Sequence, residues 1–158
     1  MKLFGYGITK ERQAHEFANA VCHVLGGGEN AVNLLIETAM QETKMGSYSD
    51  RHAHKWGVGI TQFDQIGIDE VKRSSPHVKN QVLNAFGVDI DAIELRDLAY
   101  SPLLSFICCR CFYLLKPGAI PGTVEERGEY WKMYFNSEAG HGTAEQYVSN
   151  AMLLNPFA

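Results

Sequence analysis

The chain has few features that would tie it to a membrane or to nucleic acid. No apolar run reaches the roughly 18 residues that a membrane-spanning helix needs, and the start MKLFGYGITKERQ lacks the apolar core of a secretory signal. Charged residues make up 20% of the 158 residues, with a formal net charge of −4 and no block of like charges. Since such blocks bind nucleic acid or anionic lipid, we expect no nucleic-acid partner and no membrane insertion.

Cysteine is scarce, and its placement argues against a disulfide framework. Three of the four cysteines, Cys108, Cys109 and Cys111, crowd into FICCRCFYLL, where neighbouring positions cannot all pair comfortably. Cys108 and Cys111 have the spacing of a metal knuckle, but the chain has no second such pair, and a structural zinc needs four ligands. We therefore predict reduced core thiols, Cys22 included, and no metal or other cofactor.

Length and apolar periodicity predict one mostly helical domain over residues 1–158. A helix is expected within residues 8–28, stopped by three glycines, and a second from about Asn30 to Met45 with Gly46 as its C-terminal cap. Residues 47–67, rich in Gly, His and Asp, predict a loop or a small β-hairpin. Further helices are expected in IDEVKRS, SPHVKNQVLNAFG, SPLLSFICCRCFYLLKPG, TVEERGEYWKMYF and TAEQYVSNAMLL, with starts at Ser75 or Pro76, Pro102, Thr123 and Thr143.

The segment SPLLSFICCRCFYLLKPG is apolar on nearly all sides, which predicts a central core helix. Arg110 is the exception within it, and a buried arginine requires partners. We expect Arg110 to form a structural ion pair, with contact to a substrate as the alternative.

Two glutamates lie near the end of the helix expected at residues 30–45. At about 100° per residue, Glu42 falls within about 20° of Leu35 at the edge of the apolar face, whereas Glu37 points nearly the opposite way. Glu37 is therefore expected to be a solvated charge whose change to Gln leaves activity intact. Partial burial and the negative end of the helix dipole should raise the pKa of Glu42, which suits a general acid. The alternative is a structural pairing of Glu42 with Lys44, His52, His54 or Arg110.

Two later segments carry groups that are common in ligand sites. WGVGITQFD has glycines that permit close backbone approach, beside the hydroxyl of Thr61 and the amide of Gln62. EYWKMYFNSEAGHGTAEQY adds aromatic and amide side chains: Tyr130, Trp131, Tyr134 and Asn136. Rings that stack on apolar sugar faces, together with amides that bind hydroxyls, are typical of carbohydrate sites, although each ring alone fits a core position equally well.

Three ordered segments, AMQETKMG, GVGITQF and YFNSEAGHG, resemble the motifs of lysozyme-like lytic transglycosylases. In that family a helix ends in Gln-Glu-Ser, a Gly-Leu-Met-Gln segment follows, and Tyr-Asn-Ala-Gly comes near the end. The chain is most similar to phage-encoded transglycosylases, over about residues 33–150. The resemblance implies that Glu42 is the catalytic acid/base. It also implies a set of substrate-binding residues: Thr43 at the serine position, Gly59, Gln62, Tyr134 and Asn136, the last two separated here by Phe135.

The same resemblance implies a mainly α, α+β lysozyme-like fold, in which a cleft separates a helical domain from a small β-hairpin or loop lobe. The implied reaction cleaves the β-1,4 bond between N-acetylmuramic acid and N-acetylglucosamine in peptidoglycan, leaving a 1,6-anhydro end. One alternative is a hydrolytic lysozyme with Asp50 or Asp64 as second carboxylate, which an inverting enzyme holds roughly 6.5 to 9.5 Å from the acid. Another is a catalytically silent virion protein of the same fold. A metal enzyme using His52 and His54 is a third.

The resemblance also implies partners and location. The partners would be peptidoglycan glycan strands and other phage virion or tail proteins. Because the sequence shows no export signal, we expect the protein to be made in the cytoplasm of a bacterial host. It would then be carried in the virion, or be released to the periplasm and cell wall.

Overall fold

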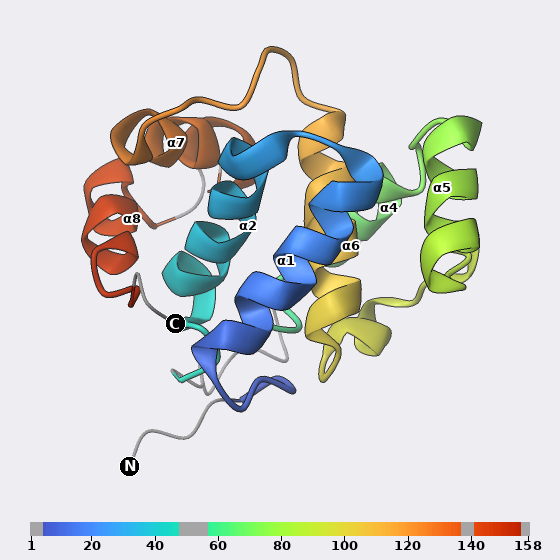
Figure 1. Ribbon diagram of the computed structural model, residues 1–158, viewed down its shortest axis with the longest axis horizontal. Helices are drawn as coiled ribbons and strands as arrows, with labels where there is room; N and C mark the ends of the chain where they lie inside the picture. Colours follow the sequence, from blue (N-terminus) through green and yellow to red (C-terminus); the bar gives the residue numbers. More distant parts are fainter. Residues whose placement is uncertain (1–4, 48–56, 137–140, 156–158) are drawn as a thin grey trace.

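The computed structural model describes residues 5–47, 57–136 and 141–155, and this part of the chain is mainly helical, as the sequence predicts (Figure 1). The α-helices are α1 (Glu11–Leu25), α2 (Gly28–Thr43), α4 (Gln65–Val71), α5 (Pro76–Phe86), α6 (Pro102–Leu114), α7 (Val124–Trp131) and α8 (Ala144–Ala151). Shorter elements are the 3₁₀ turns η1 (Ile90–Ala92) and η2 (Leu95–Leu98) and the π-helical segment η3 (Lys132–Asn136).

Side-chain caps begin several helices at the predicted places. The hydroxyls of Ser75, Ser101, Thr123 and Thr143 each accept a hydrogen bond from the backbone N–H three residues on, at 3.1 to 3.2 Å. A proline occupies the first turn of α5 and of α6, where its missing N–H leaves no helical bond unmade. These starts depend on local chemistry alone, and the predictions for them are confirmed.

The end of α2 differs from the prediction. The helix stops at Thr43 and its C-cap is Lys44 (φ 47°), which is followed by Met45 (φ 58°) and Gly46 (φ 77°), so Gly46 is not the cap. Gly46 instead packs against the backbone of Gly5, where a Cβ atom would clash with the Gly5 carbonyl. The contact with the N-terminal segment and the positive φ both favour glycine at this position.

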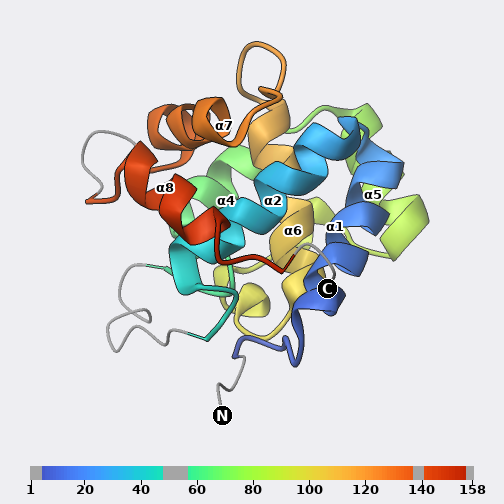
Figure 2. The same ribbon diagram turned by 60° about the vertical axis from the view of Figure 1, so that its left-hand side comes forward.

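Helix α2 runs through the middle of the molecule, with α1 on one side and α8 on the other (Figures 1 and 2). It also contacts α6, the apolar core helix, which packs on α1 and α4 as well. Every residue from Leu34 to Met40 is consequently buried. All four cysteines are free and buried, as predicted.

The segment after α2 is described only in part. Of the predicted loop or hairpin at residues 47–67, residues 48–56 lie outside the described structure. A single antiparallel bridge between Val58 and Phe63 closes a tight turn, and within the described ranges no longer strand is present. Residues 65–67 belong to α4 rather than to a loop, because Asp64 caps that helix. None of the described helices is both long and apolar enough to cross a bilayer.

Candidate functional site

Glu42 lies in the last turn of α2, partly exposed but with protein atoms around most of its carboxyl. Nε1 of Trp131, at the end of α7, donates a hydrogen bond to Oε2 of Glu42 at 3.1 Å. The Trp131 ring is fully buried and packs on Tyr147, with ring centroids 5.5 Å apart. The partner of Glu42 is therefore held rigidly.

Burial raises the pKa of Glu42 from its ordinary 4.5 to about 7, and the hydrogen bond from Trp131 opposes this rise by stabilising the carboxylate. The direction is the one that the sequence predicts. Among the structural partners considered for Glu42, Arg110 makes no ion pair with it in the described ranges. His52 and His54 lie outside the described residues. A carboxyl that is half protonated near neutral pH can serve as both acid and base.

Amide side chains from three segments gather beside this pair. Nδ2 of Asn150 donates to Oε1 of Gln41 at 2.7 Å. Gly142 packs so closely that a Cβ atom there would lie 2.5 Å from Trp131, 3.1 Å from Gln41 and 3.4 Å from Asn136. Gly142 therefore packs among Trp131, Gln41 and Asn136, which lie close to one another around it. Sequence reasoning selected Asn136 but missed Gln41 and Asn150, although Gln41 stands directly before the chosen glutamate.

Thr43 is a tether rather than an open ligand group. It is 1% exposed, its hydroxyl lies 2.8 Å from the carbonyl of Ile60, and the same oxygen accepts a bond from the N–H of Gly46 at 2.9 Å. The hydroxyl thus fastens the end of α2 to the turn that carries Gln62. In the described structure this hydroxyl joins two segments and has no free side facing a ligand.

Gly59 and Gln62 shape that turn. Gln62 has a left-handed backbone (φ 53°), and its Nε2 donates to the carbonyl of Gly59 at 2.8 Å. At Gly59 a Cβ atom would lie 2.5 Å from the carbonyl of Leu98 and 2.8 Å from the hydroxyl of Ser105. Glycine is required here for close packing on η2 and α6, while Gln62 as a residue is partly exposed.

Of the two proposed second carboxylates, only Asp64 belongs to the described residues. Oδ1 of Asp64 accepts the N–H of Gly67 at 2.7 Å, and this exposed residue is the N-cap of α4. That is the structural use expected of an aspartate at a helix start. Asp50 lies outside the described residues.

The late aromatic residues divide between core and surface. Tyr130 and Trp131 are buried, whereas Tyr134 is partly exposed and packs on Tyr130 with centroids 4.8 Å apart. Phe135 enters the core, 5.5 Å from Phe63 and 5.4 Å from Phe112 between ring centroids. Tyr134, Phe135 and Asn136 all belong to the π-helical segment η3. Because a π-helical turn holds one residue more than an α-helical turn, it accommodates Phe135 between Tyr134 and Asn136.

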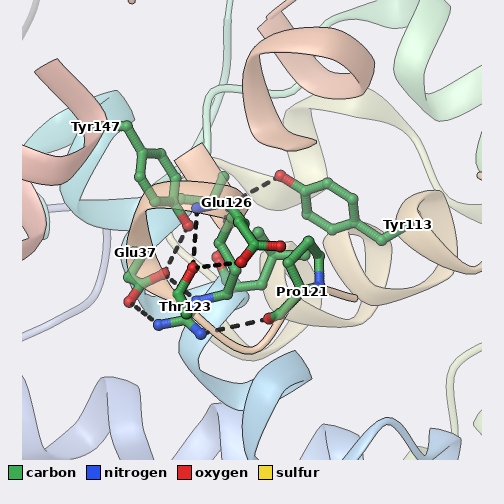
Figure 3. Close-up of polar contacts among 9 residues, drawn as sticks. Glu37, Tyr113, Pro121, Thr123, Glu126 and Tyr147 are labelled. Atoms are coloured by element: carbon green, nitrogen blue, oxygen red, sulfur yellow. Dashed lines mark hydrogen bonds and ion pairs between the residues drawn. The ribbon is translucent and has the colours of Figure 1, made fainter. Parts of the chain in front are cut away.

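Glu37 corrects the prediction made for it. It is 6% exposed, and Nε and Nη2 of Arg127 donate to its two carboxylate oxygens at 2.7 and 2.8 Å. The hydroxyl of Tyr147 donates to Oε1 at 2.8 Å (Figure 3). The hydrogen bonds that Arg127 donates to Glu37 also raise the pKa of Arg127. The solvated-charge prediction is wrong because α8 covers the side of α2 opposite its apolar stripe, which a single-helix pattern cannot reveal.

Arg110 also differs from its prediction. Its Nε donates to the carbonyl of Gly26 at 3.0 Å, and in the described part of the chain it makes no ion pair. Among residues 5–47, 57–136 and 141–155, no group of three His, Cys, Asp or Glu side chains is placed to hold a metal ion.

Comparison of the chain with protein-family models, with curated proteins and with solved structures gives no match. The surroundings of Glu42 therefore carry the functional hypothesis.

Proposed function

We propose that the protein is a lytic transglycosylase that cleaves peptidoglycan, with Glu42 as its general acid and base. The observation that carries this proposal is the crowded carboxyl at the end of α2, whose pKa burial raises to about 7. A carboxyl in this range donates a proton at neutral pH and takes one back in the next step.

The contacts around Glu42 support the same reaction. The three segments of the family resemblance are adjacent to Glu42. Thr43, the next residue, donates a hydrogen bond to the turn that contains Gln62. Trp131, which donates to Glu42, directly precedes the segment with Tyr134 and Asn136. Glu42 would protonate the oxygen of the glycosidic bond as the bond from that oxygen to the anomeric carbon breaks. The resulting carboxylate would then take the proton of the muramyl 6-hydroxyl as that oxygen attacks the same carbon. Because the nucleophile comes from the sugar itself, one carboxyl is sufficient.

The proposal assigns substrate contacts to two amide side chains and one ring that are partly exposed. Gln62, Tyr134 and Asn136 are all partly exposed and belong to segments that flank Glu42. Gly59 and Thr43, which the resemblance also implies, would act indirectly by shaping the turn. In the lysozyme-like fold that we propose, the segment after α2 forms the small lobe, and its described part is the turn from Gly57 to Phe63. By the same resemblance, the enzyme would be phage-encoded and reach the wall from a virion or on release at lysis.

Mass spectrometry of digested peptidoglycan tests this function, with wild type, Glu42→Gln and Glu29→Gln compared. Glu29 lies in the same helix but is exposed in its first turn, so it is a matched control. We expect muropeptides about 18 Da lighter than hydrolysed ones from wild type and Glu29→Gln, and none from Glu42→Gln. Hydrolysed ends would instead identify a lysozyme that uses water. Intact sacculi with folded wild-type protein would contradict the proposal and favour a silent protein of the same fold.

A further inference from the structure

A second site candidate lies at the opposite end of α2 from Glu42. A cavity of about 300 Å³ is lined by Gly27, Asn30, Arg110 and Lys116, among others. In Figure 1 the connection from α1 to α2, the end of α6 and the segment at 115–123 come together at this end. At about 1.5 Å of rise per helical residue, Gly28 and Glu42 lie roughly 21 Å apart along α2, so the cavity is separate from the proposed active site.

Arg110 is the main charge of the cavity. It is 5% exposed, and beyond the bond from Nε to Gly26 its Nη1 and Nη2 have no hydrogen-bond partner within the described ranges. Burial lowers the pKa of Arg110, since the described residues supply no carboxylate to offset the loss of water. The guanidinium of Arg110, without a carboxylate partner in the described residues and at the wall of a cavity, offers donors to an anion.

The N-terminus of α2 adds donors to the same space. This 16-residue helix has no side-chain cap at Gly27, so the N–H groups of its first turn are available. A Cβ atom at Gly27 would lie 2.7 Å from Nη2 of Arg110, so the helix start and the guanidinium are in close contact. The partial positive charge of the helix start therefore lies beside the charge of Arg110, an arrangement that favours a bound anion.

The neighbouring polar groups fit the same ligand. Asn30 lines the cavity from the first turn of α2 with a side-chain amide. Lys116 also lines the cavity, and its Nζ pairs with Glu70 at 2.7 Å. The buried hydroxyl of Tyr130 has no partner among the described residues and is near enough to Arg110 for their charges to interact.

We propose that this cavity binds an oxyanion, a carboxylate or phosphate group of a small molecule or a polymer end. Nη1 and Nη2 of Arg110 form the bidentate fork that such a group accepts. The first-turn N–H groups of α2 and the amide of Asn30 supply the remaining bonds. This binding does not depend on cleavage at Glu42.

Isothermal titration calorimetry at pH 7 and constant ionic strength tests the site, with inorganic phosphate and acetate as separate probes. Wild type should bind one equivalent of at least one of them saturably. The probe that binds more tightly identifies the source as phosphate or carboxylate. Arg110→Met should weaken binding at least tenfold, whereas Arg12→Met, at an arginine that is 70% exposed on α1, should leave it unchanged.

Asn30→Asp tests the site without removing the buried charge. An acid in the first turn of α2 favours the helix dipole, so folding stability should hold or rise, while affinity for the anion should fall at least tenfold. Asn80→Asp, exposed on α5, is its control. Should Arg110→Met fail to fold, Asn30→Asp decides alone. Absence of saturable binding of either probe to wild type overturns the proposal, as does unchanged binding in Asn30→Asp.

Discussion

Trp131 donates its indole N–H to Glu42 at 3.1 Å across a sequence separation of 89 residues. The bond stabilises the charged form of a carboxyl whose burial stabilises the neutral form. These opposed effects leave the pKa of Glu42 near 7, where both forms are present.

The pH dependence of stability should reveal the proton on Glu42. The folded pKa, about 7, exceeds the ordinary value of 4.5, so between them the folded state holds a proton that the unfolded state has released. This contribution to stability is full below pH 4.5 and is lost as the pH rises through 7, by on the order of 2 kcal/mol for a partly exposed group. Glu42→Gln lacks this loss. Between pH 4.5 and pH 8, the free energy of unfolding measured with urea should therefore fall less in Glu42→Gln than in wild type. In Glu29→Gln it should fall as much as in wild type. Parallel profiles for wild type and Glu42→Gln would contradict the shift.

Trp131→Phe should raise the pKa of Glu42 above its value in wild type, because the donor to the carboxylate is lost. Carboxyl ¹³C titration by NMR measures this directly, and the alkaline limb of the activity profile should move the same way. Tyr100→Phe, at a tyrosine that is 81% exposed, is the control for loss of an aromatic polar group. An unchanged titration in folded Trp131→Phe would show that the bond does not affect the proton.

The buried pair of Glu37 and Arg127 should dominate stability. Glu37→Gln or Arg127→Met should each lower the free energy of unfolding by about 3–5 kcal/mol, because either leaves a buried charge without its partner. The double variant Glu37→Leu/Arg127→Leu should lose less than the sum of the single changes. Urea titration measures all three, and Glu94→Gln, in an exposed ion pair, should change stability by less than about 1 kcal/mol. Similar small losses in every variant would contradict a structural role for the pair.

Thr43 offers a test of the tether between α2 and the following turn. Thr43→Ser keeps the hydroxyl and should be nearly neutral, while Thr43→Val leaves the carbonyl of Ile60 and the N–H of Gly46 without partners. We expect Thr43→Val to cost about 1–3 kcal/mol in thermal or urea unfolding. Equal stability of the two variants would mean that the hydroxyl does not hold the turn.

Local sequence chemistry predicted much of the helical framework. Hydroxyl caps and first-turn prolines act within a few residues, so the starts at Pro76 and Pro102 could be read without tertiary structure. The raised pKa of Glu42 also followed from its place beside the apolar face at a helix end. The end of α2 did not follow, because Lys44 rather than a glycine adopts the left-handed cap conformation, and Gly46 lies two residues further on against Gly5.

The sequence by itself determined where most helices begin and that α6 is a core helix, since both depend on nearest neighbours along the chain and on overall apolarity. Only the tertiary structure decided which side chains meet. It buried Glu37 against Arg127, brought Trp131 to Glu42 and placed Arg110 at the wall of a cavity. The physical reason is that a helix pattern shows one apolar face, whereas α2 is covered by α1, α6 and α8 together. Charges on such a helix are placed by partners that are distant in sequence.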